Sequence, residues 1–179
     1  MALNGSGGCS VLFLNEGMGR APVFTFANLS EVAGFMSWAL MQREKFNELA
    51  ASTTTYGILN DIRFTVEGNN VYLLFEMLTQ DAAGQNMVTL AANVACDYIK
   101  QQTNHSFFLE SNLNSDKKAS FRNMILGRGH GVIAETHVTK SVMTRVLNVD
   151  QDFLYESFNY FPIVSAMAGT HGNGLHISN

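Results

Sequence analysis

The apolar residues of this chain follow the spacing of strands in some segments and of helices in others. A polar turn at residues 67–70 also indicates a hairpin between two strands. The intermixed elements predict an α+β fold, with a mostly antiparallel sheet and helices packed on one face. The predicted strands are residues 11–14, 23–26, 62–66, 71–77, 105–109 and 132–138; the predicted helices are residues 28–50, 86–100, 140–148 and 150–161, and residues 119–126 form a short apolar segment.

The ends of these elements carry local signals. Asn28 and Glu31 have the spacing of a capping box at the start of a helix, and Pro162 is expected to end the last helix. The first strand is expected to end at residues 15–17, with a turn at residues 18–22. Helical spacing predicts two apolar faces, one formed by Val32, Phe35, Met36, Ala39 and Leu40, the other by Val88, Ala91, Ala92, Ala95 and Ile99.

The segment from Leu78 to Met87 connects a predicted strand to a predicted helix through a turn that contains Gly84. The first N–H groups of a helix have no partner inside the helix, so such an end attracts phosphate or carboxylate groups. Asp81 is placed either to cap the helix or to bind a ribose hydroxyl. This segment alone therefore leaves open both a nucleotide site and an ordinary helix cap.

Composition limits the possible partners. The 179 residues predict one domain, residues 11–179, after a flexible lead-in at residues 1–10. The net charge of −4 gives no basic surface for nucleic acid. Charged residues make up 15% of the chain, against about 25% in typical domains, so part of the surface is expected to be apolar and to meet another domain or subunit.

The cysteines and the first residues indicate the compartment. Cys9 and Cys96 form no disulfide framework, and Cys96 falls on the apolar face of a predicted helix, which fits a reducing environment. The first residues have neither the basic segment nor the long apolar core of a signal peptide, and no apolar run approaches the length of a membrane span. The sequence predicts a cytoplasmic protein, and we expect no metal site in it.

Five motifs occur in an order and at spacings that resemble the hydroxymethylglutaryl-CoA reductase family. The resemblance extends from about residue 11 to the end of the chain. It implies the small, nucleotide-binding domain of that family, which has a ferredoxin-like α+β fold. The motifs are residues 17–23 (GMGRAPV), 81–87 (DAAGQNM), 116–118 (DKK), 127–129 (GRG) and 165–169 (SAMAG), with His176 and Asn179 beyond them.

In the family this domain is inserted into a larger domain that holds coenzyme A, and the active site lies at a dimer interface. The resemblance thus implies reduction of a thioester to an alcohol in two hydride steps, with NADPH or NADH as the cofactor. It implies an acyl-CoA-like or other carboxylated small molecule as the substrate, and a homodimer or a complementary large domain as the partner. The family's catalytic glutamate, aspartate and histidine belong to segments outside this sequence, so we expect the chain alone to be incomplete as an enzyme.

The resemblance also assigns roles to single residues. Lys117 matches the catalytic lysine, whose ammonium would stabilise negative charge on the thioester oxygen. Asp116 and Lys118 match neighbours that hold the acyl part, and Arg20 matches the arginine that meets the substrate carboxylate. The residues that match the dinucleotide loop are Asp81, Gly84, Asn86 and Met87.

Several positions depart from the family pattern. Ala83 and Gln85 stand where methionines are usual, but Gln85 can still donate to a phosphate and is kept as a cofactor-binding candidate. Thr55 lacks the charge that would pair with the extra phosphate of NADPH. Glu110 stands at an expected substrate-binding serine, where its charge would repel a carboxylated substrate, and residues 160–161 (YF) replace a lysine and an asparagine.

Two alternatives to a reductase domain remain open. The altered loop, Glu110 and Tyr160 also fit a free-standing, repurposed domain that acts as a non-redox biosynthetic enzyme or a small-molecule binding module. Such a domain would use the pocket around Arg20 and residues 116–118 for a different ligand. The low charge content also fits a structural dimerisation unit, which would give no reason for the basic residues of that pocket.

Overall fold

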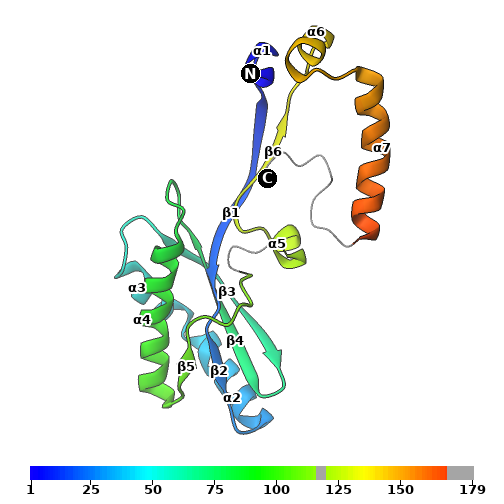
Figure 1. Cartoon of the computed structure of the whole chain (residues 1–179). Coiled ribbons are helices and arrows are strands. Elements are labelled where there is room, and N and C mark those ends of the chain that lie inside the picture. The colour runs from blue at the N-terminus through cyan, green and yellow to red at the C-terminus, as the bar shows by residue number, and fades with distance from the viewer. Residues whose placement is uncertain (116–119, 169–179) are drawn as a thin grey trace. The chain divides into compact units, whose positions relative to one another are not determined.

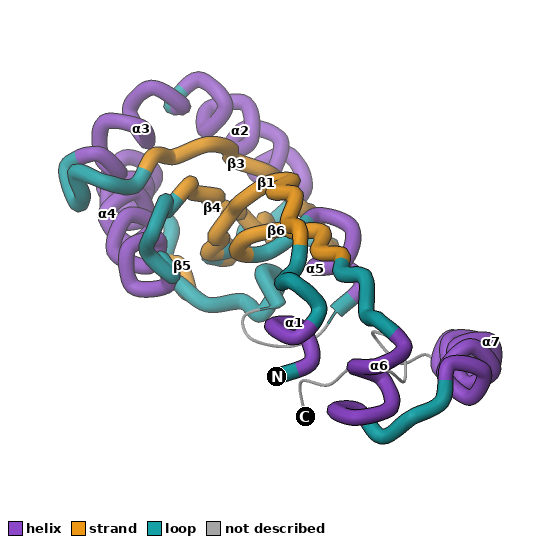
Figure 2. Tube along the Cα trace, turned by 90° about the horizontal axis from the view of Figure 1, so that it is seen from above, coloured by secondary structure: helices purple, strands orange, loops and turns teal. Residues whose placement is uncertain are grey.

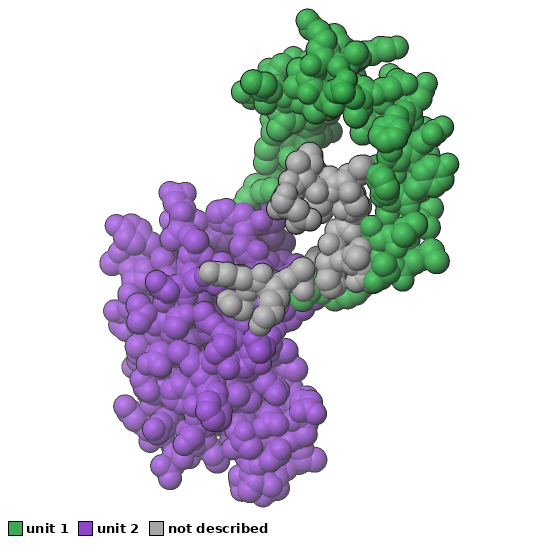
Figure 3. Space-filling view, in the orientation of Figure 1, with its two compact units in different colours: residues 1–14, 119–121, 132–179 green, residues 15–118, 122–131 purple. Residues whose placement is uncertain are grey.

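The computed structural model describes residues 1–115 and 120–168 of the chain (Figure 1). These residues form two compact units, which Figure 3 shows in different colours. Each unit combines segments that are distant in the sequence. Of the described residues, unit 2 contains 15–115 and 122–131, and unit 1 contains 1–14, 120–121 and 132–168.

Strand β4 (Asn70–Leu78) is the centre of the sheet in unit 2. Five of its side chains are buried, on both faces of the sheet, as its run of apolar residues leads one to expect. Along one edge it pairs antiparallel with β3 (Ile58–Glu67), which confirms the predicted hairpin. Gly68, at the turn, has a φ of 59°, a conformation that glycine adopts without steric cost.

The other edge of β4 pairs with two strands that follow one another. β1 (Ser10–Arg20) places Met18 opposite Met77, and β2 (Val23–Thr25) continues the same antiparallel register beyond Ala21 and Pro22. The predicted turn at residues 18–22 is therefore wrong. The glycines that suggested it serve close packing instead, since a Cβ at Gly19 would lie 2.8 Å from the Leu74 side chain.

Two short pairings complete the sheet. β5 (Phe107–Phe108) pairs antiparallel with β2, and β6 (Gly129–Glu135) lies next to β1. Without β1 and β6, the strand order in the sheet is β5-β2-β4-β3. Helices connect β2 to β3 and β4 to β5, while β3 and β4 form a hairpin, which is the ferredoxin-like arrangement.

Three helices cover one face of this sheet (Figure 2). They are α2 (Leu29–Met41), α3 (Arg43–Ala51) and α4 (Gln85–Thr103). Their apolar faces meet those of β2 and β4 in one buried cluster with Phe24 and Phe75 at its centre. The predicted α+β fold with a mostly antiparallel sheet and helices on one face is confirmed.

The predicted helix at residues 28–50 is two helices, separated at Gln42. The capping box is confirmed, because the Glu31 N–H donates to Asn28 Oδ1 at 3.0 Å. Leu40, predicted on the buried face, is 62% exposed. It lies at the border of the apolar stripe, and α2 ends one residue later, before another element covers it. The predicted face of α4 is buried as expected, from Val88 to Ile99.

Unit 1 contains α1 (Ala2–Gly5), α6 (Lys140–Val142), a π-helical turn (Met143–Leu147) and α7 (Gln151–Met167). The predicted stop at Pro162 is wrong, because α7 continues through this residue. A proline inside a helix removes one N–H donor and crowds the carbonyl four residues earlier, which disfavours a helix without always ending it. The predicted lead-in at residues 1–10 and single domain at residues 11–179 stay predictions, since compact units need not fold independently.

A short helix, α5 (Phe121–Leu126), precedes β6, and its residues are divided between the two units. In the described part of the chain, none of the helices is both long and apolar enough to cross a membrane.

Candidate functional site

The predicted nucleotide loop lies between the end of β4 and the start of α4 in unit 2. Gly84 is the N-cap of α4 and has a φ of 75°, so no side chain caps the helix at this position. The cap predicted for Asp81 is therefore wrong. A turn closed by the Ala82 N–H and the Thr79 carbonyl at 3.1 Å leaves Asp81 exposed at its tip, three residues before the cap.

The amino end of α4 has the features of an anion site. The first intrahelical bond is donated by Val88 to the Gly84 carbonyl at 2.9 Å, so the amides of Gln85, Asn86 and Met87 precede it. The first turn contains no acidic residue that would compensate the positive end of the helix dipole. Asn86 is exposed, and Gln85 and Met87 are half-buried, so a ligand can approach this end.

Only glycine fits at position 84. A Cβ there would lie 2.2 Å from Thr79 Cγ2, and the backbone is in the left-handed region. Thr79 is buried and donates its hydroxyl to the Ala82 carbonyl at 2.8 Å. The loop is therefore a tight turn with Thr79 at its centre.

Two hollows flank this loop. One, which we call the Tyr56 hollow, has a volume of about 330 Å³ and is lined by Tyr56, Thr79, Gln80, Asp81, Ala82 and Met87. The other, which we call the Glu16 hollow, has a volume of about 350 Å³, and its lining includes Glu16, Met18, Asp81, Ala82 and His130. Asp81 and Ala82 line both hollows, so a ligand that extends over the loop tip would contact both.

Glu16 connects β1 to the loop. Its Oε1 accepts the backbone N–H groups of Thr79 at 2.7 Å and of Gln80 at 2.9 Å, and its Oε2 lies 3.6 Å from His130 Nε2. The Glu16 side chain is 17% exposed. The first strand was predicted to end at residues 15–17, whereas β1 continues to Arg20, so sequence reasoning missed the role of Glu16.

Arg20, at the end of β1, forms an ion pair with Glu110. Its side chain is 13% exposed, and its Nε has no hydrogen-bond partner within residues 1–115 and 120–168. Glu110 was expected to repel a carboxylated substrate. In the structure its charge is paired with Arg20, the arginine that the resemblance assigns to the substrate carboxylate.

The segment after Glu110 is fixed to the same end of β1. Asn114 is 1% exposed and donates from Nδ2 to the Gly19 carbonyl at 2.9 Å, and Ser111 Oγ donates to the Ala21 carbonyl. This segment leads directly into residues 116–118. Asp116, Lys117 and Lys118 themselves lie outside the described residues, as do His176 and Asn179.

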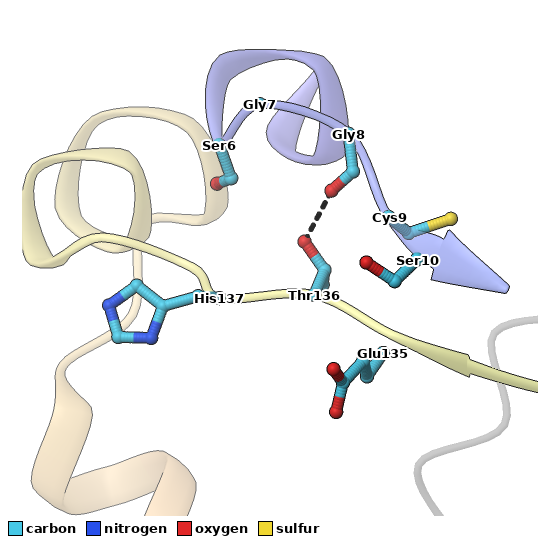
Figure 4. Close-up of a pocket in the computed structure, with 8 residues that line it drawn as sticks. All are labelled: Ser6, Gly7, Gly8, Cys9, Ser10, Glu135, Thr136 and His137. Carbon is cyan, nitrogen blue, oxygen red and sulfur yellow. Dashed lines mark hydrogen bonds between the residues drawn. The ribbon is translucent and has the colours of Figure 1, made fainter.

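Unit 1 has a hollow of its own, of about 460 Å³, between the turn after α1 and the end of β6 (Figure 4). The Thr136 hydroxyl donates to the Gly8 carbonyl at 2.7 Å. Figure 4 shows the sulfur of Cys9 pointing away from the His137 ring and from the Glu135 carboxylate. These side chains do not form a nucleophile–base pair. The described residues also contain no cluster of His, Cys, Asp and Glu that could hold a metal ion.

The family model described as hydroxymethylglutaryl-coenzyme A reductase matches residues 1–179. The chain belongs to this family. The 3-hydroxy-3-methylglutaryl-coenzyme A reductases of Haloferax volcanii and Pyrococcus abyssi are 35% and 34% identical to it, each over 99% of its length. The resemblance found from the five motifs is confirmed.

The reductase relatives are longer than this chain, which spans 44% of the Haloferax volcanii protein and 45% of the Pyrococcus abyssi protein. A class II 3-hydroxy-3-methylglutaryl-CoA reductase from Streptococcus pneumoniae, solved with bound NADPH in open conformations, has the same fold over 93% of this chain and 43% of that chain. The TM-score is 0.60 at 14% sequence identity, so this likeness concerns the fold alone.

Three residues of the candidate site were missed from the sequence: Glu16, Tyr56 and Thr79. Glu16 lies within β1, Tyr56 lies two residues before β3, and Thr79 directly follows β4. The pairing of β1 and β3 with β4 brings Glu16 and Tyr56 to the loop that contains Thr79. The one sequence signal was the run of glycines after Glu16, which we interpreted as a turn although it permits close strand packing.

Proposed function

We propose that this chain is the dinucleotide-binding part of an NAD(P)H-dependent thioester reductase of the HMG-CoA reductase type. The observation that carries the proposal is the amino end of α4, which has no acidic residue in its first turn and lies beside two hollows that share one loop. The coverage of less than half of the relatives' length supports an incomplete enzyme, to which further sequence contributes the remaining catalytic groups.

In this proposal the backbone amides of Asn86 and Met87 bind the pyrophosphate, because they lie at the positive end of the α4 dipole, and Gln85 begins the same turn as a further cofactor-binding residue. The exposed carboxylate of Asp81 accepts hydrogen bonds from a ribose. Gly84 keeps the loop close to α4. When bound, the reduced nicotinamide supplies the hydride.

The same site favours NADH over NADPH. Neither hollow has a described lysine or arginine in its lining, whereas Glu16 and Asp81 both contribute carboxylates. The extra phosphate of NADPH adds negative charge, and here it would lack a cation to pair with. Thr55 lies in a separate hollow beside Tyr56 and brings no charge either.

Lys117, Asp116 and Lys118 are proposed as the catalytic and acyl-binding residues, next to the anchored segment that ends at Ser115. Lys117 would stabilise the negative charge that develops on the thioester oxygen. Arg20 would bind a carboxylated acyl group after exchanging its partner Glu110 for the substrate.

The proposed partner is a complementary large domain or a second copy of the chain. Unit 1 supports it, because the described side chains of β1 and β6 that belong to this unit include exposed Val11, Leu12, Phe13, Val132 and Ile133. Apolar surfaces of this extent mark sites of association.

Titration calorimetry of the 179-residue chain with NADH and NADPH tests the nucleotide site. We expect binding of NADH in the micromolar to millimolar range and weaker binding of NADPH, and Gly84→Ala is expected to abolish both. Gly68→Ala is the matched control, because Gly68 has a similar φ of 59° but open space where its Cβ would lie. Absence of heat with both nucleotides at millimolar concentration contradicts the proposal.

The Arg20–Glu110 ion pair favours a second candidate, a free-standing domain repurposed for non-redox chemistry or for binding a small molecule. An arginine whose charge is already compensated is less suited to a carboxylated substrate. A screen of neutral and cationic small molecules against the same chain, with binding that is lost in Glu110→Gln, would support this candidate over the reductase.

A further inference from the structure

One oxygen of the Glu16 carboxylate is held by two hydrogen bonds within unit 2. Oε1 accepts the N–H groups of Thr79 and Gln80 at 2.7 and 2.9 Å, and Oε2 lies 3.6 Å from His130 Nε2. The two N–H groups come directly after β4, which ends at Leu78. A carboxylate that accepts two backbone N–H groups makes charge-assisted hydrogen bonds, which are stronger than those between neutral groups.

The loop that these bonds hold has an unfavourable backbone. Gln80 has a φ of 52°, in the left-handed region that residues other than glycine rarely adopt. Gly84 has a φ of 75° and lies directly against Thr79. Strained conformations of this kind persist only where the surroundings fix them. The bond from the Gln80 N–H to Glu16 acts on the strained residue itself.

The position of the loop decides the shape of both hollows. Thr79 and Asp81 line the Tyr56 hollow and the Glu16 hollow, and Met87, in the first turn of α4, lines the Tyr56 hollow. If the loop moved away from β1, the two hollows and the approach to the α4 amides would change together.

We propose that Glu16 is a positioning residue for the dinucleotide: its carboxylate fixes the 79–84 loop against β1 and so presents Asp81 and the α4 amides in one binding geometry. This inference rests on the proposed nucleotide function. It adds a residue that contacts no ligand atom and acts through the loop, with His130 Nε2 3.6 Å from its second carboxylate oxygen.

Amide hydrogen exchange of the 179-residue chain tests the contact without a ligand. In the native chain, we expect the Thr79 and Gln80 amides to exchange at least about 100-fold more slowly than in an unstructured peptide. In Glu16→Ala, this protection is expected to fall by about tenfold or more, with that of the α4 amides less affected. Native protection below threefold would overturn the inference without any variant.

Nucleotide titration of the same variants tests the positioning role. Glu16→Ala is expected to weaken NADH binding by about tenfold or more, because the loop loses its binding geometry. Glu16→Gln keeps an oxygen that can accept both N–H groups, so it is expected to restore most of the protection and most of the affinity. Glu67→Gln, at an exposed carboxylate of β3, is the matched control and should change neither.

The outcomes separate this inference from the proposed function. If the native chain binds neither nucleotide, the proposed function fails and the positioning role fails with it, even where exchange shows that Glu16 holds the loop. If the native chain binds NADH and Glu16→Ala loses protection at Thr79 and Gln80 but keeps the affinity, the proposed function stands and the inference is overturned. A Glu16→Ala chain that does not fold is replaced by Glu16→Gln and Glu16→Met, compared on both measurements.

Discussion

The two units of this chain differ in how much apolar surface they bury. Of the buried apolar residues in the described chain, Val142 alone belongs to unit 1, and the others, from Met18 to Ile99, belong to unit 2. In unit 1, α7 exposes Phe153, Phe158 and Ile163. Unit 2 has a core that can support a folded state, whereas the described residues of unit 1 bury a single apolar side chain.

The unit with the larger buried core also contains the candidate nucleotide site. The loop with Gly84, Glu16 and the amino end of α4 is set in unit 2, where packed strands hold each group in place. Unit 1 contains residues 1–14 and 132–168 of the described chain, and the chain spans 44% of the Haloferax volcanii reductase. We therefore attribute the apolar excess of the composition to unit 1, as a surface for the proposed partner.

The largest expected difference between the units is in the loss of stability when one phenylalanine ring is removed from each. Phe75 is 2% exposed and packs edge-to-face on Phe46 at 5.7 Å, so Phe75→Ala should lower the free energy of unfolding by about 3–5 kcal/mol. Phe158 is 55% exposed on α7, and Phe158→Ala should change it by about 0.5 kcal/mol or less. Urea unfolding followed by far-ultraviolet circular dichroism measures both.

A large loss of stability in Phe158→Ala would break the comparison, because it would mean that α7 is covered in solution. Measuring the unfolding midpoint at several protein concentrations then distinguishes the two causes. A midpoint that rises with concentration indicates that a second copy of the chain covers α7, and a constant midpoint indicates packing within one chain.

The core of unit 2 was the part most readily predicted. The stripe from Val88 to Ile99 and the hairpin at residues 67–70 follow from local spacing and turn chemistry, and both are confirmed. The fold class followed for the same reason, since each element of unit 2 is amphipathic and buries one face against the sheet. The family motifs were read from the sequence without any structure.

The errors occurred where contacts distant in sequence override local preference. Gly17 and Gly19 suggested a turn, but they lie within β1 and allow Leu74 and Glu76 to approach. Asp81 suggested a helix cap, but hydrogen bonds from Thr79 to Glu16 and to the Ala82 carbonyl fix the loop, and Gly84 is the N-cap of α4. No local pattern reports a hydrogen bond between residues more than 60 positions apart, such as that of Glu16 with Thr79.

An intermediate effect is expected at the two cysteines, one in each unit. Cys9 is exposed in unit 1, whereas Cys96 is buried in unit 2, where burial raises the pKa of its thiol and leaves little of the reactive thiolate. Cys9 should react with a thiol reagent about 100-fold faster than Cys96, or about 2.7 kcal/mol in free energy. Both should react in 6 M guanidinium chloride, about the concentration that unfolds most domains.

Cys9→Ser and Cys96→Ala chains assign the two phases. A slow reaction of Cys9 in the native chain would contradict the exposure of this part of unit 1, and would show that another surface covers it.

The smallest effect concerns acid and the ion pairs of unit 2. The Arg63 Nε–H donates to Asp61 at 2.7 Å, and this hydrogen bond is the main cause that holds the pKa of Asp61 below its ordinary value of 3.8. A pKa depressed in the folded state stabilises it above the unfolded pKa, and this stabilisation is lost as the pH falls through the folded pKa. Asp61→Asn should therefore cost up to about 1 kcal/mol at pH 7, because the Asp61 side chain is 33% exposed and solvent screens the pair.

The pH dependence distinguishes this cause from lost packing. The difference between the native chain and Asp61→Asn in urea midpoint should be constant from pH 7 to pH 5 and should shrink as the pH falls below 3.8. Glu156→Gln, at an exposed carboxylate beyond the first turn of α7, is the counterpart in unit 1 and should change the midpoint far less than Asp61→Asn does at pH 7. A gap that persists undiminished in acid would mean that Asp61 acts through its hydrogen bonds as an uncharged group, and that its charge adds nothing to the stability that the core of unit 2 provides.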